Sequence, residues 1–153
     1  MKRFSLYNTS ILSVIIITAL FILTQCSQTT THKALIVTGQ NNSHSWEVGS
    51  EMLKTMLMNT GLFEVDMAVS PEKGGDMSGF KPQFSGYDVV VLDYDGDAWP
   101  EETKAAFVDY MSNGGGLVVF HAANNAFADW KEFNLMTGVG GWGGRDAEAG
   151  PRI

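Results

Sequence analysis

Three short apolar runs constrain the fold of this chain more than any other feature of its sequence. The runs are ALIV, VVVL and LVVF, and each leads into a polar or glycine-containing corner. Another segment, from Phe63 to Val69, alternates apolar and polar residues. Continuous apolar runs of this length are typical of strands that are buried on both faces of a parallel sheet, whereas alternation is typical of a strand that is buried on one face.

Segments with helical patterning separate these strands. Between Trp46 and about Asn59 the apolar residues fall at helical spacing, and Gly61 follows the helix that this spacing predicts. The methionines of the stretch are expected to fill the core: Met52, Met56 and Met58. We therefore expect this helix to pack its apolar side against the sheet.

Two further helices are expected later in the chain. Pro100 suits the first turn of a helix, which three consecutive glycines end before the LVVF strand. Asp129 and Glu132 have the spacing of a capping box, and the short helix that they predict ends near Gly138. The resulting order β-α-β-loop-β-α-β-α predicts an α/β fold, with a parallel sheet that carries helices on both faces. Ligands of such folds bind at the carboxyl ends of the strands.

The N-terminus has the pattern of an export signal. Lys2 and Arg3 precede an apolar run from Ile11 to Leu23, which is short for a membrane-spanning helix. Cys26 follows in LTQC, so the segment resembles a bacterial lipoprotein signal in which Cys26 is the lipidation site. Gln25 departs from that pattern, because a small residue normally precedes the cysteine. A plain secretory signal and an uncleaved anchor are the alternatives.

The predicted organisation has three parts. Residues 1–25 are the signal peptide, residues 26–32 are a polar linker, and residues 33–153 form one domain, which is expected to be incomplete on its C-terminal side. The protein is expected to be exported and membrane-anchored as a lipoprotein, in the periplasm or on the cell surface.

Charge limits the partners of the exported domain. Removal of residues 1–25 takes 2 of the 10 basic residues and none of the 17 acidic ones, which leaves a net charge of about −9. Such a surface repels phosphate backbones and anionic lipids, so we expect no nucleic-acid partner and a membrane contact only through the lipid. Cys26 is the only cysteine, so the folded domain has no thiol nucleophile.

Two histidines follow predicted strands. His121 comes directly after LVVF, and His44 lies in the loop after the first strand, so both are expected at the same edge of the sheet. Histidines there suit general acid or base catalysis, and two histidines with a carboxylate suit Zn²⁺ or a similar divalent metal. The alternatives are a strand-capping role for His121 and a solvated loop position for His44.

Carboxylates and an aromatic–arginine pair are further candidates for a site. Asp93, Asp95 and Asp97 follow the VVVL strand, and Asp93 is best placed to contact a ligand or to orient a histidine, with a polar turn as the alternative. Trp142 and Arg145 lie in GGWGGR. An indole stacks on the C–H face of a sugar and an arginine binds its hydroxyls, so both are expected to bind substrate, with a surface loop as the alternative.

Several segments together resemble the trehalose-utilisation (ThuA-like) family: KALIVTGQNNSHSWEVGSEMLKTML, GLFEVDMA, the stretch from YDVVVLDYDGD to HAANNAF, and GGWGGR. The resemblance covers about residues 33–151. It implies a flavodoxin-like fold similar to that of class I glutamine amidotransferases. In those enzymes the corner after this strand holds a nucleophilic cysteine. This chain has His121 there, so it is not a cysteine-dependent amidotransferase.

The resemblance implies carbohydrate metabolism, with a small carbohydrate ligand and a bound divalent metal, and points to His44, His121 and Arg145. The expected function is that of an exported hydrolase or lyase acting on a glycoside or keto-sugar. His121 and His44 are the expected catalytic residues and metal ligands, while Trp142, Arg145 and Asp93 bind substrate. A non-catalytic sugar-binding lipoprotein and an inactive fragment or interaction module are the alternatives.

Overall fold

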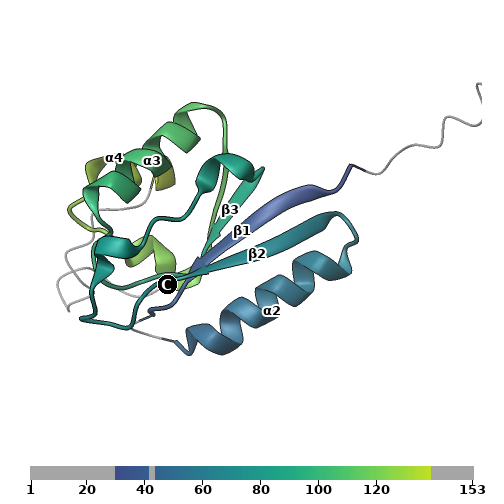
Figure 1. Ribbon diagram of the computed structural model, residues 1–153. Helices are drawn as coiled ribbons and strands as arrows, with labels where there is room; N and C mark the ends of the chain where they lie inside the picture. The colour runs from purple at the N-terminus through teal and green to yellow at the C-terminus, as the bar shows by residue number, and fades with distance from the viewer. Residues whose placement is uncertain (1–29, 42–43, 139–153) are drawn as a thin grey trace, which may run out of the picture. The chain divides into compact units, whose positions relative to one another are not determined.

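In the computed structural model, which describes residues 30–41 and 44–138, four parallel strands form one sheet (Figure 1). The strands are β1 (His32–Thr38), β2 (Phe63–Val69), β3 (Val89–Leu92) and β4 (Gly116–Val119). Their order across the sheet is β2-β1-β3-β4, and every pairing is parallel. The parallel α/β sheet predicted from the apolar runs is therefore confirmed.

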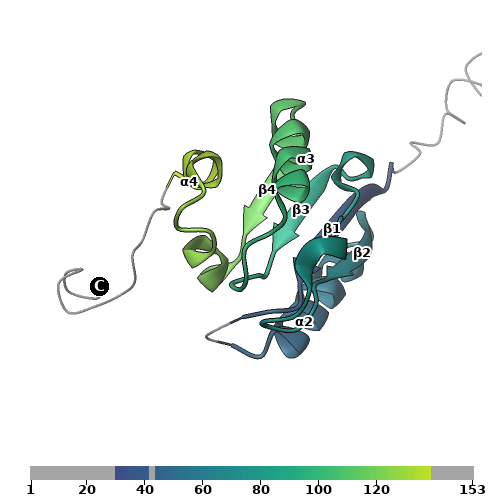
Figure 2. The ribbon, with the colours of Figure 1, turned by 60° about the vertical axis from the view of Figure 1, so that its left-hand side comes forward.

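The burial of each strand follows its place in the sheet. The inner strand β1 is buried continuously from Ala34 to Thr38, whereas β2 alternates between partly buried and exposed positions over most of its length. Figure 2 shows β2 and β4 at the two edges of the sheet. The alternating pattern of β2 thus reflects its edge position. The prediction that the LVVF run is buried on both faces is wrong, because β4 is the other edge strand and its Val118 is 47% exposed.

Helices lie on both sides of the sheet, as the element order predicts. The helix α2 (Trp46–Asn59) packs against β1 and β2, while α3 (Glu101–Ser112) and α4 (Lys131–Thr137) lie on the opposite side (Figure 1). Short 3-10 helices occur in the connections: η1 (Met77–Gly79), η2 (Phe84–Gly86) and η3 (His121–Asn125). No helix in the described ranges combines the length and hydropathy needed to cross a bilayer.

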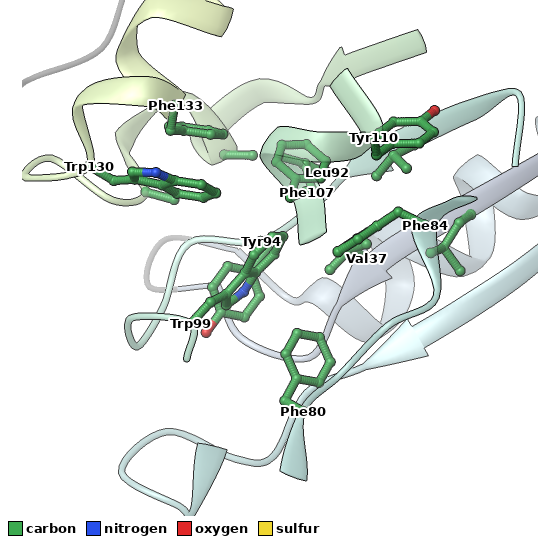
Figure 3. Packing of buried hydrophobic residues seen from close by; sticks show 14 residues of the cluster. Val37, Phe80, Phe84, Leu92, Tyr94, Trp99, Phe107, Tyr110, Trp130 and Phe133 are labelled. Carbon is green, nitrogen blue, oxygen red and sulfur yellow. The ribbon is translucent and has the colours of Figure 1, made fainter. Parts of the chain in front are cut away.

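An aromatic cluster fills the space between the sheet and the helix α3 (Figure 3). Trp99 is 2% exposed and lies at its centre, with its ring against those of Phe84, Phe107 and Trp130. Trp130 connects the cluster to Phe133 of α4. Because rings of this size contribute most of the apolar area that a small domain buries, this cluster fixes α3 and α4 against the strands.

The prediction that the methionines of α2 fill the core is wrong. Met52 and Met56 are 60% and 64% exposed, and Met58 is also exposed. The side of α2 that faces the sheet carries Gly49 and the fully buried Ser50 instead. Small residues let the backbone of the helix approach the sheet closely, which turns the methionines outward.

The predicted capping box before α4 is also wrong. Trp130, not Asp129, is the N-cap residue, and no side chain caps the helix. The residue that precedes this helix is instead held by its side chain, because Trp130 is buried in the aromatic cluster. The predicted end is correct, since Gly138 closes α4 with a left-handed backbone, φ 68°.

Candidate functional site

The carboxyl ends of three strands bring three predicted site residues and Asn41 to one edge of the sheet. Asn41 and His44 follow β1, Asp93 follows β3 and His121 follows β4. From β1 the chain turns outward to β2 and then crosses to β3 on the other side, so the strand order reverses between β1 and β3. In open parallel sheets such a reversal leaves a crevice at the strand ends, where ligands bind.

His44 and His121 lie in contact. Their rings meet edge to face, with centroids 4.5 Å apart and an interplanar angle of 76°. Both residues are exposed, so solvent or a ligand reaches the pair. The structure thus brings together two histidines that no sequence spacing links, on loops that follow β1 and β4.

The backbone of His121 is strained. Its φ of 47° lies in the left-handed region, which non-glycine residues rarely adopt and which costs about 1–3 kcal/mol. The strand β4 keeps its pairing up to this corner, since the Phe120 N–H donates to the Leu92 carbonyl at 2.9 Å. His121 then opens η3, so the strained turn fixes the place from which its imidazole reaches His44.

Asp93 is the buried member of the site. It is 3% exposed, and its N–H donates to the Val37 carbonyl at 2.9 Å. Its Oδ1 accepts a long hydrogen bond of 3.4 Å from Asn41 Nδ2, while Oδ2 has no hydrogen-bond partner among the described residues. Burial raises the pKa of Asp93, and the hydrogen bond from Asn41 and the charges of the two histidines oppose that rise in the pKa.

Asn41 is a site residue that the sequence reasoning missed. Its Nδ2 donates to Asp93, and its Oδ1 accepts the backbone N–H of His44 at 3.0 Å. One amide therefore holds the carboxylate and the loop that carries the histidine. Its position in a polar loop after a buried strand was the available signal, but nothing in the sequence distinguishes it from its asparagine neighbours.

The acidic corner after β3 separates into one site residue and a structural turn. Buried Gln40 organises the turn: its Oε1 accepts the Asp97 N–H at 2.8 Å and its carbonyl accepts the Asp95 N–H at 3.0 Å. Asp97 in turn accepts the Gly74 N–H at 2.6 Å. The interpretation as a polar turn therefore fits Asp97, whereas Asp93 interacts with the histidines.

A metal centre is not formed by the site side chains in their present arrangement. Within residues 30–41 and 44–138, no three His, Cys, Asp or Glu side chains are placed to hold a metal ion together. His44 and His121 are two imidazole donors in contact, but Asp93 does not complete a set with them. Metal ligation by these two histidines stays a prediction.

Three predicted residues lie outside the part of the chain that the structure describes. They are the lipidation site Cys26 and the substrate-binding candidates Trp142 and Arg145. Their roles stay predictions.

Comparisons with known proteins agree with the fold and identify relatives. Residues 33–151 match the model of a family described as ThuA, trehalose utilisation. The crystal structure of a ThuA-like protein from Parabacteroides merdae is 54% identical with a TM-score of 0.73, over 80% of this chain and 43% of that one. A ThuA-like protein from Bacteroides uniformis is 25% identical with a TM-score of 0.48, over 71% of this chain and 44% of that one. No curated protein matches the sequence. The chain spans less than half the length of these two solved relatives.

Proposed function

The chain belongs to the ThuA, or trehalose-utilisation, family, and we propose that its site is an acid–base centre that cleaves a neutral glycoside carrying a keto group. One observation carries this proposal: the imidazoles of His44 and His121 are in contact and exposed at the carboxyl edge of a parallel sheet, beside a buried carboxylate. Family membership supports a role in trehalose utilisation.

Two adjacent imidazoles suit an elimination next to a ketone. His121 removes a proton from the carbon beside the carbonyl, and the electron pair of that C–H bond forms a C=C bond. The bond from the neighbouring carbon to the glycosidic oxygen breaks, and a protonated His44 gives its proton to this leaving oxygen. One proton is taken up and one is released, so the step needs no oxidant or reductant.

The groups around the two histidines support this step. The strained turn holds the His121 ring in one orientation, so the ring loses little orientational freedom when the substrate binds. The negative charge of Asp93 stabilises the imidazolium that forms when His121 takes up the proton. Asn41 holds that carboxylate and the backbone of His44 in one arrangement.

A divalent metal at the same histidines is a separate proposal. When bound, such an ion would polarise the carbonyl of the sugar. The family resemblance supports it, and the two imidazole donors are compatible with it, but no three-donor set lies within the described residues.

Export is likewise a proposal, and its support is the sequence before residue 27. We propose that Cys26 is lipidated and that the domain works outside the cytoplasm. Labelling of cells with a radioactive fatty acid tests this, because the wild type should take up label and a Cys26→Ser variant should not.

The test of the function uses the third histidine as a control. Release of sugar from disaccharides and from their keto derivatives would be measured for the wild type and for His44→Ala, His121→Ala and His32→Ala. His32 opens β1 at the opposite end of the strand and pairs with Asp88 at 3.5 Å. We expect the first two variants to lose about 10²–10⁴-fold in kcat and the control to keep its turnover.

Two results would contradict the proposal in different ways. Full turnover by His121→Ala would remove the acid–base centre. Sugar binding by the wild type without turnover of any substrate would identify a binding protein on the same scaffold.

A further inference from the structure

Two buried oxygen atoms without hydrogen-bond partners lie at the ends of neighbouring strands in the candidate site. The buried polar and charged residues of the described ranges are Thr38, Gln40, Ser50, Ser70, Asp93 and Thr103. Four of these side chains donate hydrogen bonds to backbone carbonyls. The hydroxyl of Thr38 and Oδ2 of Asp93 make none with described residues. Since folded proteins pair nearly all their buried polar atoms, these two are suited to bond to each other.

We propose that Thr38 is a positioning residue of the acid–base centre, whose hydroxyl donates to Oδ2 of Asp93 when that carboxylate is charged. Asn41 donates to Oδ1 of the same carboxylate, so the two donors together hold both of its oxygens. The pairing of Thr38 with Asp93 stands on the geometry alone. Its part in catalysis rests on the proposed function, which places the charge of Asp93 beside His121.

The pairing of β1 with β3 brings these two side chains to the same place. The register joins Val37 to Leu92, and the Asp93 N–H donates to the Val37 carbonyl at 2.9 Å. Val37 and Leu92 both pack in the aromatic cluster on the α3 side of the sheet (Figure 3). The next residue of each strand therefore points to the other face, on the side of α2. Adjacent strands are about 4.8 Å apart, so the hydroxyl of Thr38 can reach the carboxylate of Asp93.

The surroundings leave the hydroxyl of Thr38 available for this bond. Thr38 is 0% exposed and Asp93 is 3% exposed, so bulk water does not replace a protein donor at Oδ2. Ser50, on the side of α2 that faces the sheet, donates its hydroxyl to the Trp46 carbonyl instead. No described residue bonds the Thr38 hydroxyl in its present rotamer, and one rotation about χ1 redirects it.

A carboxylate that is held at both oxygens keeps one orientation. In the proposed step the charge of Asp93 stabilises the imidazolium of His121, and that stabilisation depends on where the charge lies. Thr38 is fully buried, so it does not touch the substrate and acts only through Asp93. Loss of its hydroxyl should therefore lower kcat and leave KM nearly unchanged.

A double-mutant cycle of urea unfolding at neutral pH tests the pair without a substrate. Thr38→Val keeps the shape of the side chain and removes the hydroxyl, so we expect it to raise the unfolding equilibrium constant about tenfold. In an Asp93→Ala background the same change should alter that constant by less than about twofold. Thr103→Val is the matched control. Its buried hydroxyl donates to the Phe80 carbonyl at 2.6 Å, so this variant should be destabilised equally in both backgrounds. Equal effects of Thr38→Val in the two backgrounds would overturn the pairing.

Kinetics with the keto-disaccharide that the wild type cleaves fastest test the catalytic role. Thr38→Val should lower kcat about tenfold with little change in KM. Thr38→Ser keeps the hydroxyl and should retain most of the wild-type kcat, although it loses a buried methyl group. Thr103→Val should turn over like the wild type despite its lower stability.

The possible failures are distinguishable. An unchanged kcat in Thr38→Val, or a Thr38→Ser variant as slow as Thr38→Val, would overturn the positioning role. A wild type that turns over no sugar would contradict the proposed function, and the unfolding cycle would still decide whether Thr38 and Asp93 are paired.

Discussion

A Cβ atom on Gly49 would lie 3.0 Å from Oδ2 of Asp93. The first turn of α2 therefore closes over the carboxylate, and the absence of a side chain at Gly49 leaves the room that Oδ2 occupies. The same oxygen has no hydrogen-bond partner among residues 30–41 and 44–138. The helix thus encloses the carboxylate without neutralising it.

Gly49→Ala should separate activity from stability. The added methyl group forces Asp93 or the helix to move by a few tenths of an ångström, and we expect kcat to fall about tenfold. Alanine is favoured over glycine inside a helix by about 1 kcal/mol, so the melting temperature should stay constant or rise. Thr55→Ala, on the exposed part of α2, is the control. Unchanged turnover in Gly49→Ala would show that the position of Asp93 is not critical.

Asp93→Asn should make the protein more stable at pH 7 and less active. The variant has no charge to bury, so its free energy of unfolding, measured in urea, should exceed that of the wild type by on the order of 1 kcal/mol. Its kcat should fall, because the imidazolium loses its negative neighbour. The exposed Asp109→Asn should change neither quantity.

The pH dependence of this gain has a definite sign. Burial raises the pKa of Asp93, so the folded protein keeps a proton that the unfolded chain has already lost. The wild-type free energy of unfolding therefore falls as the pH rises from the ordinary pKa of an aspartate to the raised pKa of folded Asp93. The advantage of Asp93→Asn should shrink when the pH is lowered below the ordinary pKa of an aspartate. An advantage that grows in acid would contradict the direction of the shift.

Asn41→Ala should act on catalysis through position. It removes the contacts to Asp93 and to the backbone of His44, so we expect kcat to fall about tenfold with a smaller change in KM. Asn41→Asp keeps the acceptor for His44 but places a second negative charge beside Asp93, and should shift the pH profile to higher pH. Asn113→Ala, at the end of α3, is the control. A loss confined to KM would assign Asn41 to substrate binding alone.

The metal prediction has a direct measurement. If a divalent ion binds at His44 and His121, elemental analysis of the purified chain should find about one equivalent, and a His44→Ala/His121→Ala double variant should lack it. A protein that is active and free of metal would contradict the metal prediction and leave the acid–base pair in place.

The sequence predicts that His44 and His121 lie close together because the carboxyl ends of parallel strands share one edge of the sheet. The loops that follow these strands therefore emerge at that edge. It does not predict Asn41 or Gly49, whose roles depend on side-chain contacts between loops that are distant in the chain. The error at Met52 and Met56 has a related cause. Helical spacing shows that a helix has apolar positions, but the small residues on its other side decide which side approaches the sheet.

At the left-handed turn of His121, selection for stability and selection for catalytic turnover favour different residues. Glycine adopts a φ of 47° without strain, so a variant library sorted only for resistance to unfolding should enrich glycine at position 121. A library sorted for sugar turnover should retain histidine. The two enrichment maps would diverge at this corner, and the size of the divergence would measure how much stability the molecule gives up for its chemistry.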